Sequence, residues 1–265
     1  MRERPGAVTD SRSDRNLEVR LAKSKDEILA AKRLRYEVFV NEMGAKLTGI
    51  VDGIEQDHFD AFCQHLVVIC PASGQVVATT RLLTEENARC AGGFYSSKEF
   101  HLATIRQLPG NLLEVGRTCV HADYRTGKTL GTLWSGLEAF IAAHQVSYVF
   151  GCASIPIADS GCSAQAILDA LGPRFFSPWH LRLQPLSCLP APARQDPVVP
   201  SIPALVKTYL RLGAWICGEP CWDPEFGVAD VFILLELKRL NTRYADRLLE
   251  ISRAGGMSKQ VAKVA

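Results

Sequence analysis

The sequence predicts an α+β domain whose mixed, mostly antiparallel β-sheet is flanked by helices. Three observations support this fold class. The chain opens with a strand pattern followed by a helix pattern, and two β-branched runs, 64–70 and 75–83, are separated by a Pro-Ala-Ser-Gly turn. Strands and helices then follow one another irregularly, without an internal repeat or a clean linker, so we expect one domain over 17–250.

The first strand and helix are defined by local signals. Residues 17–21 alternate between apolar and polar side chains, as in a half-buried strand. Ser24 and Glu27 then form a capping box ahead of a helical pattern. That pattern runs to about Met43, where Gly44 can end the helix. The two β-branched runs that follow predict an antiparallel hairpin.

The later elements are predicted from hydrophobic periodicity and glycine stops. Ser201 can cap a helix that Gly213 ends. Prolines concentrate between 173 and 203, so we expect an irregular excursion there that contains one short strand. The expected strands are 112–120, 146–154, 179–183, 214–217 and 228–237, and the expected helices are 133–144, 163–171, 201–212 and 242–252.

Composition excludes several classes of protein. The 30 basic and 28 acidic residues give a net charge of +2, which is not the basic excess of a nucleic-acid-binding protein. No apolar run approaches the roughly 20 residues that span a bilayer, and residues 1–16 lack the apolar core of a secretory signal. The nine cysteines show neither zinc nor redox spacing. We expect a cytoplasmic protein with no bound metal, reduced thiols, a disordered segment at 1–16 and a flexible basic tail at 251–265.

Charged residues on apolar elements are the candidates for a functional site. Arg35 and Phe39 share the inward stripe of the first helix, and Arg81 and Glu114 interrupt apolar strands. With Arg117 and two aspartates these residues supply three positive and three negative groups, which suits a buried site for a zwitterion. A purely structural network is the alternative. The set consists of Arg35, Asp57, Asp60, Arg81, Glu114 and Arg117.

Gly116 lies between two of these charged residues. Glu114 and Arg117 are an odd number of positions apart, so a regular strand would send them to opposite faces. A β-bulge at Gly116 would bring both to one face, splay the strand and leave backbone N–H groups free. An ordinary strand with a glycine at a close approach of another chain is an equally good reading.

A possible phosphate site follows the same strand. The segment Arg125-Thr-Gly-Lys-Thr-Leu-Gly131 joins that strand to a helix, where free N–H groups and the helix dipole can hold a phosphate. Such turns are common, so the signal is weak alone. Its place directly after the charged strand makes Arg125, Gly127, Lys128 and Gly131 the candidate residues.

In this order, the motifs resemble the GCN5-related N-acyltransferase fold. Arg35-Tyr-Glu-Val-Phe39, Asp57-His-Phe-Asp60, Arg81 and Glu114-Val-Gly-Arg117 are similar to the pattern of acyl-homoserine-lactone synthases. The chain from about 17 to 250 resembles still more closely the ornithine-acyl carrier protein N-acyltransferases of ornithine lipid biosynthesis. Further segments carry that resemblance: Gly93-Phe-Tyr-Ser96, Glu99-Phe100, Leu113–Val120, Gly151-Cys-Ala-Ser154 and Gly213–Pro220.

The resemblance implies transfer of a (3-hydroxy)acyl group from acyl carrier protein to the α-amine of ornithine, giving lyso-ornithine lipid. Acyl-phosphopantetheine would be the co-substrate and no cofactor would be bound. The phosphate turn lacks the tight glycine pattern of acetyl-CoA enzymes, which favours a carrier protein that presents a single phosphodiester. The chain also lacks an H-x-x-x-x-D motif, so O-acylation would need another enzyme.

Roles for the candidate residues follow from this chemistry. Glu114 would accept a proton from the amine, and N–H groups at the Gly116 bulge would stabilise the oxyanion. One or more of Arg35, Arg81 and Arg117 would hold the substrate carboxylate, with Phe39 beside them. Asp57 and Asp60 would hold the distal ammonium. Cys119 is more simply a core residue than a nucleophile.

Three other functions remain open at this point. A homoserine-lactone synthase would use the same cluster for S-adenosylmethionine, although the long C-terminal half with Trp222 argues against it. An N-acyl amino acid synthase would take another amino acid. A non-catalytic binder of acyl carrier protein would have been suggested by loss of Glu114 or the arginines, which are present. The one-chain amphiphilic product also implies transient contact with the inner face of a membrane, helped by Arg253, Lys259 and Lys263.

Overall fold

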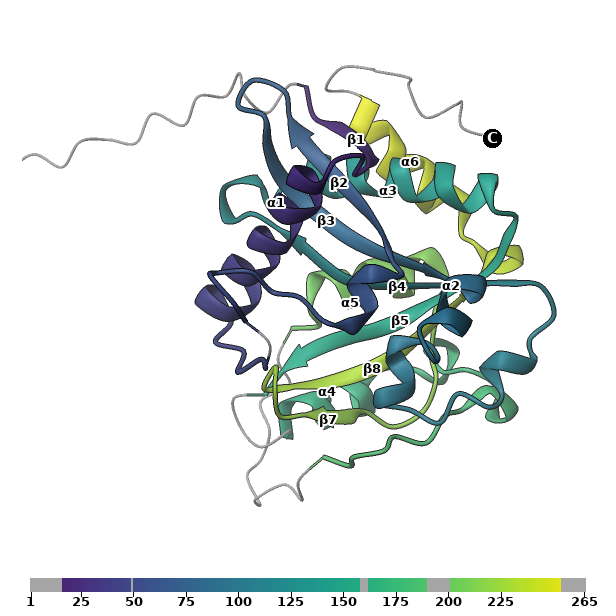
Figure 1. Cartoon of the computed structure of the whole chain (residues 1–265). Helices are drawn as coiled ribbons and strands as arrows, with labels where there is room; N and C mark the ends of the chain where they lie inside the picture. The colour runs from purple at the N-terminus through teal and green to yellow at the C-terminus, as the bar shows by residue number, and fades with distance from the viewer. Residues whose placement is uncertain (1–15, 49, 158–161, 190–200, 254–265) are drawn as a thin grey trace, which may run out of the picture.

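Figure 1 shows the computed structural model of the chain, which describes residues 16–48, 50–157, 162–189 and 201–253. One sheet of eight strands forms its centre, in the order β1-β2-β3-β4-β5-β8-β6. The strand β7 also pairs with β8, at the first residues of that strand. Only the β4–β5 pair is parallel among these strands, which confirms a mixed, mostly antiparallel sheet. The strands are β1 Glu18–Leu21, β2 Gln64–Cys70, β3 Gln75–Thr84, β4 Asn111–Val120, β5 Val146–Pro156, β6 Trp215–Ile216, β7 Cys221–Asp223 and β8 Val228–Glu236.

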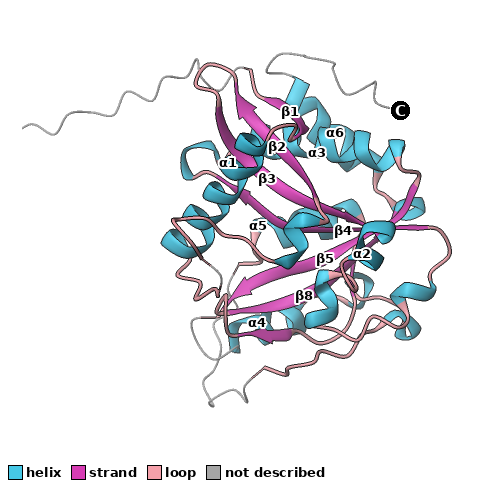
Figure 2. Ribbon diagram, viewed as in Figure 1, coloured by secondary structure: helices cyan, strands magenta, loops and turns pink. Residues whose placement is uncertain are grey.

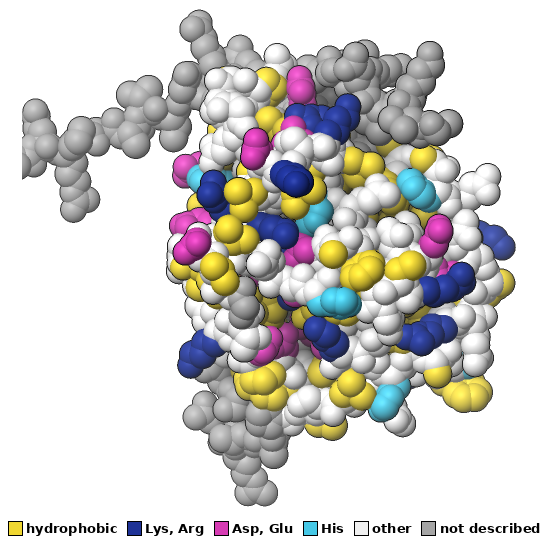
Figure 3. Space-filling view, in the orientation of Figure 1, with side chains coloured by type: hydrophobic (Ala, Val, Ile, Leu, Met, Phe, Trp, Pro, Cys, Tyr) yellow, Lys and Arg dark blue, Asp and Glu magenta, His cyan; other side chains and the backbone are white. Residues whose placement is uncertain are grey.

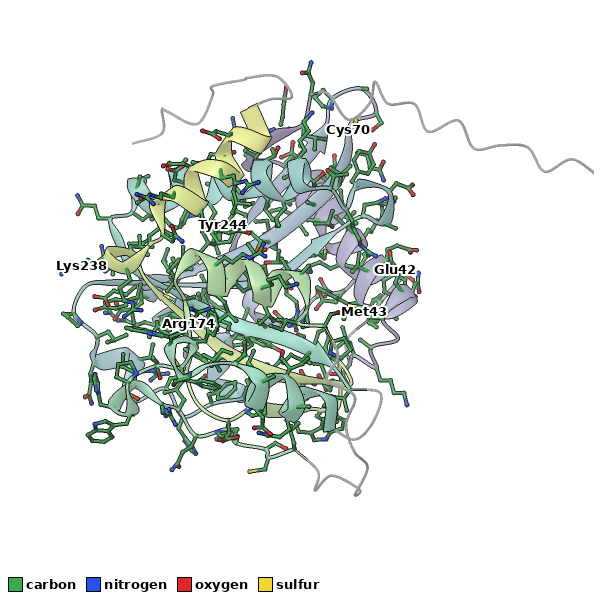
Figure 4. The ribbon with its side chains drawn as sticks, turned by 180° about the vertical axis from the view of Figure 1, so that it is seen from behind. Glu42, Met43, Cys70, Arg174, Lys238 and Tyr244 are labelled. Atoms are coloured by element: carbon green, nitrogen blue, oxygen red, sulfur yellow. The ribbon has the colours of Figure 1, made fainter. Side chains whose placement is uncertain are left out.

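Helices cover both faces of this sheet. In Figure 1, α1 and α2 lie in front of it, and Figure 4, seen from behind, brings α5 and α6 to the front. The rear helices pack on one hydrophobic core, and two smaller cores fill the front face. The helices are α1 Lys25–Tyr36, which continues as a π-helical turn Glu37–Glu42, α2 Glu85–Cys90, α3 Gly127–Ala143, α4 Cys162–Ala170, α5 Ala204–Leu212 and α6 Thr242–Arg253.

Local sequence signals explain most element boundaries. The Ser24 hydroxyl accepts a hydrogen bond from the Glu27 N–H at 3.2 Å, and the Glu27 carboxylate accepts one from the Ser24 N–H, which confirms the capping box. Gly213 ends α5 with a φ of +99°. A Cβ there would lie 2.7 Å from a backbone oxygen, so both conformation and space require glycine.

Two predictions in the proline-rich region are wrong. Residues 179–183 were expected to form a strand, but Trp179–Leu181 forms a 3₁₀ turn after Pro178. Ser201 was expected to cap α5, but the helix begins at Ala204 with Pro203 in the capping position. Proline lacks an N–H and has a fixed φ, so it is well suited to the start of a helix.

The central strands β4 and β5 separate halfway along their length. Their pairing runs from Asn111↔Val146 to Glu114↔Phe150 and stops there, and Figure 2 shows the two strands diverging. Gly151 lies at the fork, where an added Cβ would lie 2.2 Å from the carbonyl oxygen of Val115. The glycine therefore allows the two backbones to meet at the point where they part.

A bulge in β4 lies next to this fork. Thr79 pairs with Cys119 and Arg81 pairs with Gly116, so β4 carries one more residue than β3 between these pairs. The expected bulge is therefore present, but the left-handed residue is Arg117, with a φ of +53°. An added Cβ at Gly116 would have no other atom within 4 Å. Close packing of another segment therefore does not explain this glycine.

The described helices include none that is both long and apolar enough to cross a bilayer. Figure 3 shows basic and acidic side chains interspersed on the face that carries α1 and α2. The terminal segments 1–15 and 254–265, including the lysines of the basic tail, lie outside the described residues, as does 190–200 of the proline-rich excursion.

Candidate active site

Three arginines and three carboxylates form one ionic cluster between α1, the loop after it and the sheet. All six carry charge into largely buried positions, so their equal numbers are needed for stability. The structure brings together five of the six residues predicted to form this network. The members are Arg35, Glu55, Asp57, Asp60, Arg81 and Arg117.

Arg35 is the centre of the cluster. Its guanidinium donates to both carboxylate oxygens of Asp60, at 2.7 and 2.9 Å, and forms an ion pair with Glu55. Burial is the largest single influence on the Asp60 carboxyl and favours its neutral form, but the hydrogen bond and charge of Arg35, the charge of Arg81 and the Asp57 N–H together lower the pKa. Arg35 is fully buried, and neither it nor Asp60 lines the two cavities described below. Arg35 and Asp60 thus pair with each other away from both cavities, and direct contact of either residue with substrate stays a prediction from the sequence.

The other two arginines lie at the edge of the cluster. Arg81 donates to Asp57 at 2.6 Å, and Arg117 approaches Glu55 at 3.3 Å and Asp57 at 3.5 Å. The guanidinium of Arg117 also stacks over the ring of Tyr95, 4.5 Å from its centroid, and donates to its hydroxyl. These contacts hold Arg117 in its left-handed conformation.

Glu114 does not belong to this network, which corrects the prediction; Glu55 takes its place. Both carboxylate oxygens of Glu114 accept backbone N–H groups, from Tyr95 at 2.6 Å and from Ser96 at 2.7 Å, and the Ser96 hydroxyl donates as well. Burial raises the pKa of Glu114, against the opposing effect of these bonds. Glu114 therefore anchors the 3₁₀ turn Tyr95–Lys98 to the fork of the sheet.

A cavity of about 780 Å³ passes through this fork. Glu114, Gly116, Arg81, Arg117 and Phe39 line it on the front face. Behind the fork its walls are mostly apolar and come from α3, α5, β5 and β8, including Leu133, Trp134, Val149, Val206, Leu212 and Ile233. The cavity thus joins a charged chamber to an apolar channel.

The predicted phosphate turn lies at one end of this cavity. Arg125 and Gly127 line it, but Lys128 and Gly131 do not. Thr126 caps α3 by accepting the Thr129 N–H at 3.2 Å, so the start of the helix faces the same opening. Arg125 forms an ion pair with Glu42 at the end of the first helix. Figure 4 labels Glu42 and Met43, which also line the cavity, beside the free end of β5.

Three carboxylates outside the predicted set of site residues line the large cavity, and two of them, Glu99 and Asp223, also line a second cavity of about 380 Å³. Oxygens of Glu99, Asp223 and Asp230 lie within 4.8 Å of one another. Glu99 and Asp223 line both cavities, as do Tyr95 and Arg117, so the two spaces meet at these residues. The sequence signal for one of them was present, because Asp230 interrupts an otherwise apolar strand, as Arg81 does.

Cys119 is a core residue. It is buried in the cluster under α1, and burial raises the pKa of its thiol to about 12. A thiol that stays protonated at neutral pH is a poor nucleophile. The structure thus supports the core role that the sequence favoured.

Comparisons with known proteins agree with this geometry. Residues 34–135 match the family model described as an acetyltransferase (GNAT) domain. The L-ornithine N(alpha)-acyltransferase of Brucella abortus (strain 2308) is 38% identical over 252 residues, with 86% of this chain and 87% of that protein covered. The protein of the same name from Rhizobium meliloti (strain 1021) is 35% identical, with 86% and 83% covered.

Solved structures show the same fold at low sequence identity. A CoA-dependent acyl-homoserine lactone synthase, BjaI, in a structure with SAM and isopentyl-CoA, aligns with a TM-score of 0.56 at 16% identity over 92% of both chains. The acyl-homoserine lactone synthase LasI aligns with a TM-score of 0.51 at 12% identity, over 92% of this chain and 98% of that one. With a forked central sheet, a GNAT-type domain and curated relatives matched along most of its length, the chain belongs to the L-ornithine N(alpha)-acyltransferase family.

Proposed function

We propose that the protein transfers a (3-hydroxy)acyl group from an acyl carrier protein thioester to the α-amine of ornithine. The observation that carries this proposal is the single cavity that connects the start of α3, the fork of the sheet and the charged chamber. An acyl thioester needs an anchor for its phosphate, a slot for its carbonyl and an apolar channel for its chain. The cavity offers all three in that order.

On the donor side, the phosphopantetheine phosphate would lie at the start of α3 near Arg125 and Gly127. The thioester would lie at the fork, where β4 loses its partner after Glu114 and keeps backbone groups on that edge for a ligand. The acyl chain would occupy the apolar channel between α3 and α5. A carrier protein presents one phosphodiester at this opening, and one arginine at a helix start suits that charge.

The reaction forms a C–N bond and breaks a C–S bond. The amine nitrogen attacks the thioester carbonyl carbon, the tetrahedral intermediate places negative charge on oxygen, and the thiol leaves with a proton. Backbone N–H groups at the bulge of Gly116 and Arg117 would stabilise that oxygen. Glu114 would accept the amine proton, directly or through water, and burial raises its pKa, which makes the carboxylate a stronger base.

Arg117 and Arg81 are the arginines positioned to hold a substrate carboxylate, because both line the large cavity. Arg35 and Asp60 would act indirectly: Arg35 holds the Asp60 carboxylate, which in turn orients the guanidinium of Arg81. Among the described contacts, the Nη1 atom of Arg117 has no hydrogen-bond partner, which leaves it for a ligand. Phe39 packs edge-on against Phe226 beside this chamber, with the ring centroids 5.6 Å apart.

The test is to mix the purified protein with acyl-carrier and acyl-CoA thioesters and a panel of amino acids, and to identify products by mass spectrometry. Nα-acylornithine is the expected product, formed faster from the carrier thioester. A lactone product, or no acylated amine with any amino acid, would overturn the proposal. Because the expected product is a one-chain amphiphile, we further propose a cytoplasmic enzyme that contacts the inner membrane surface transiently.

A further inference from the structure

The ionic cluster leaves the distal ammonium of the amino acid without a partner. Asp57 and Asp60 were the sequence candidates for that role, but arginines already neutralise both: Asp60 pairs with Arg35 and Arg81, and Asp57 pairs with Arg81 and, at 3.5 Å, with Arg117. The side chain of Asp60 is only 3% exposed. A second cation at these aspartates would therefore have to displace an arginine from a buried ion pair, which is strongly unfavourable.

The three carboxylates where the two cavities meet, Glu99, Asp223 and Asp230, are negative groups without a matching set of positive groups. Glu99 is 7% exposed and Asp230 is 4% exposed, yet neither forms an ion pair with a described cationic group. The Oε2 atom of Glu99 is buried and has no hydrogen-bond partner. Buried acidic groups without a partner are costly, so the orphaned oxygen indicates a place for a cationic group of a ligand.

The surroundings of this carboxylate define what can bind there. Cys152 of β5 lies beside Glu99, and the hydroxyl of Ser154, two residues further along the same strand, donates to Asp230 at 2.7 Å. Asp223 faces it from the end of β7, and its Oδ1 atom accepts the N–H groups of Glu225 and Phe226. Tyr95 and Arg117 complete the walls.

We propose that Glu99, Asp223 and Asp230 bind the side-chain ammonium of the acceptor amino acid and thereby select ornithine over amino acids with neutral side chains. This inference rests on the proposed function. Arg117, which lines the same junction, would hold the α-carboxylate, so the α-amine between the two groups faces the fork and the thioester. The three carboxylates, called the acidic trio below, thus match the side-chain ammonium, Arg117 matches the α-carboxylate, and the α-amine remains free to react.

The same arrangement accounts for the site of acylation. An ammonium held among carboxylates stays protonated and has no lone pair with which to attack a thioester. The δ-amine is therefore protected while the α-amine loses its proton near Glu114. Loss of the trio should weaken both the choice of substrate and the choice of nitrogen.

A divalent metal ion is the competing occupant of three clustered carboxylates. Hard cations need six or more oxygen ligands or ordered waters, whereas a thiol and a guanidinium share the walls here. An ammonium needs only three acceptors, one for each N–H. The positive charge of Arg117 also opposes a doubly charged ion more than a singly charged one.

The experiment compares L-ornithine with L-norvaline, which has the same carbon chain without the terminal amine. Initial rates of thiol release from an acyl-carrier thioester give kcat/KM for each, in wild type, Glu99→Gln and Asp230→Asn. Glu138→Gln, at an exposed position of α3, is the matched control. We expect wild type and the control to prefer ornithine by about 100-fold or more, and both trio variants to reduce that preference about 10- to 100-fold through KM.

Each alternative outcome has a distinct signature. No acylation of either amino acid by wild type would refute the proposed function itself. Equal use of both amino acids by wild type, or unchanged preference in both trio variants, would refute the ammonium site and leave the acyltransferase proposal standing. Loss of ornithine use on chelation, restored by Mg²⁺ or Ca²⁺, would assign the trio to a metal.

The position of the acyl group in the product distinguishes a binding role of the trio from a structural one, because a purely structural role would not change which nitrogen is acylated. Fragmentation in the mass spectrometer separates Nα- from Nδ-acylornithine, and we expect the Nδ product to rise only in the trio variants. Folding is checked by thermal unfolding with and without ornithine. Glu99→Gln should fold, because glutamine mimics the protonated carboxyl that burial favours at this position.

Discussion

Glu42, at the end of the π-helical turn after α1, forms an ion pair with Arg125, which lies 83 positions further along the chain at the opening of the large cavity. The guanidinium of Arg125 also donates to the carbonyl of Val120 at 3.2 Å. A phosphate arriving at the start of α3 would therefore meet an arginine that is already partly neutralised. The first helix thus controls the charge of the proposed donor entrance.

Glu42→Gln tests this competition. Removal of the carboxylate frees Arg125 for the phosphodiester, so we expect KM for the acyl-carrier thioester to fall by about two- to fivefold, the range of a half-exposed ion pair. Arg125→Glu/Lys128→Glu should raise KM and flatten its dependence on salt. Both are measured as kcat/KM across a salt series, with Glu138→Gln as the control. Identical values for Glu42→Gln and wild type would show that the ion pair does not restrain Arg125.

Glu114→Gln separates proton transfer from anchoring. The amide can replace only part of the acceptor capacity of the carboxylate, so we expect the free energy of unfolding to fall by about 1–3 kcal/mol. The fold should remain, and turnover should drop by about two to four orders of magnitude, as for loss of a general base. Ser96→Ala removes one bond but keeps the carboxylate, and its turnover should fall less than about tenfold. Comparable losses in both variants would make Glu114 an anchor alone.

Gly116 and Gly151 predict opposite effects of the same substitution. Gly151→Ala would place a Cβ 2.2 Å from the Val115 carbonyl, so it should force the fork apart and lower thermal stability. Gly116→Ala meets nothing within 4 Å and should fold normally. Its methyl group would enter the space proposed for the thioester, so kcat/KM should fall without a change in melting temperature. Full activity of Gly116→Ala would place the thioester elsewhere.

Arg35→Met tests the central ion pair. Removal of this guanidinium leaves Asp60 and Glu55 buried without their shortest ion pair, with only the longer contacts to Arg81 and Arg117 remaining, so we expect a loss of about 3–5 kcal/mol in the free energy of unfolding, measured in urea. Arg89→Met is the control, because Arg89 forms an exposed pair with Glu85 and should cost less than about 1 kcal/mol. The folded pKa of Asp60 lies below its unfolded value, so the stability from this pair is present above about pH 4 and is lost as pH falls further. Equal losses in the two variants would contradict this role.

The sequence predicted the elements better than the site because most elements depend on local signals. The capping box at Ser24 and the glycine stop at Gly213 are set within a few residues, and both are present. The irregular segment after Pro173 gives no periodic pattern, and the expected strand there is a 3₁₀ turn held by contacts with distant residues. The bulge was predicted from Gly116, but the left-handed residue is Arg117, whose conformation depends on Tyr95 and the ionic cluster.

Residues of the site were likewise predicted where a local sequence signal marks them and missed where none exists. Arg35 and Arg81 could be identified because a charge on an apolar stripe needs a partner. Glu55 could not, since it lies in a loop without periodicity, and it takes the place expected for Glu114. The trio at the junction comes from three segments, and only Asp230 interrupts an apolar run, so its assembly depends on the tertiary fold.

The pH dependence of substrate choice provides the last prediction. Burial, followed by the charge of Asp230, raises the pKa of Glu99 to about 8, so below that pH the carboxyl is neutral and attracts an ammonium weakly. The ornithine side chain stays protonated well above this range, because alkyl ammonium groups titrate near about pH 10. The ratio of kcat/KM for ornithine to that for norvaline should therefore rise between about pH 6 and pH 9 and then level off.

The thioester and Glu114 are common to both reactions, so their titrations cancel in the ratio. The α-amines of the two substrates titrate differently, because the side-chain ammonium of ornithine lowers the pKa of its α-amine, but this difference is the same in wild type and Glu99→Gln. The comparison of the two proteins therefore isolates Glu99. In Glu99→Gln the ratio should be low, with most of its rise with pH removed and only the smaller effect of Asp230 remaining, since burial raises the pKa of that residue as well. A ratio that stays constant in wild type, or that rises to the same extent in Glu99→Gln, would show that titration of Glu99 does not govern ammonium binding. Initial rates for the two amino acids, measured in one buffer series at constant ionic strength, are sufficient to decide the point.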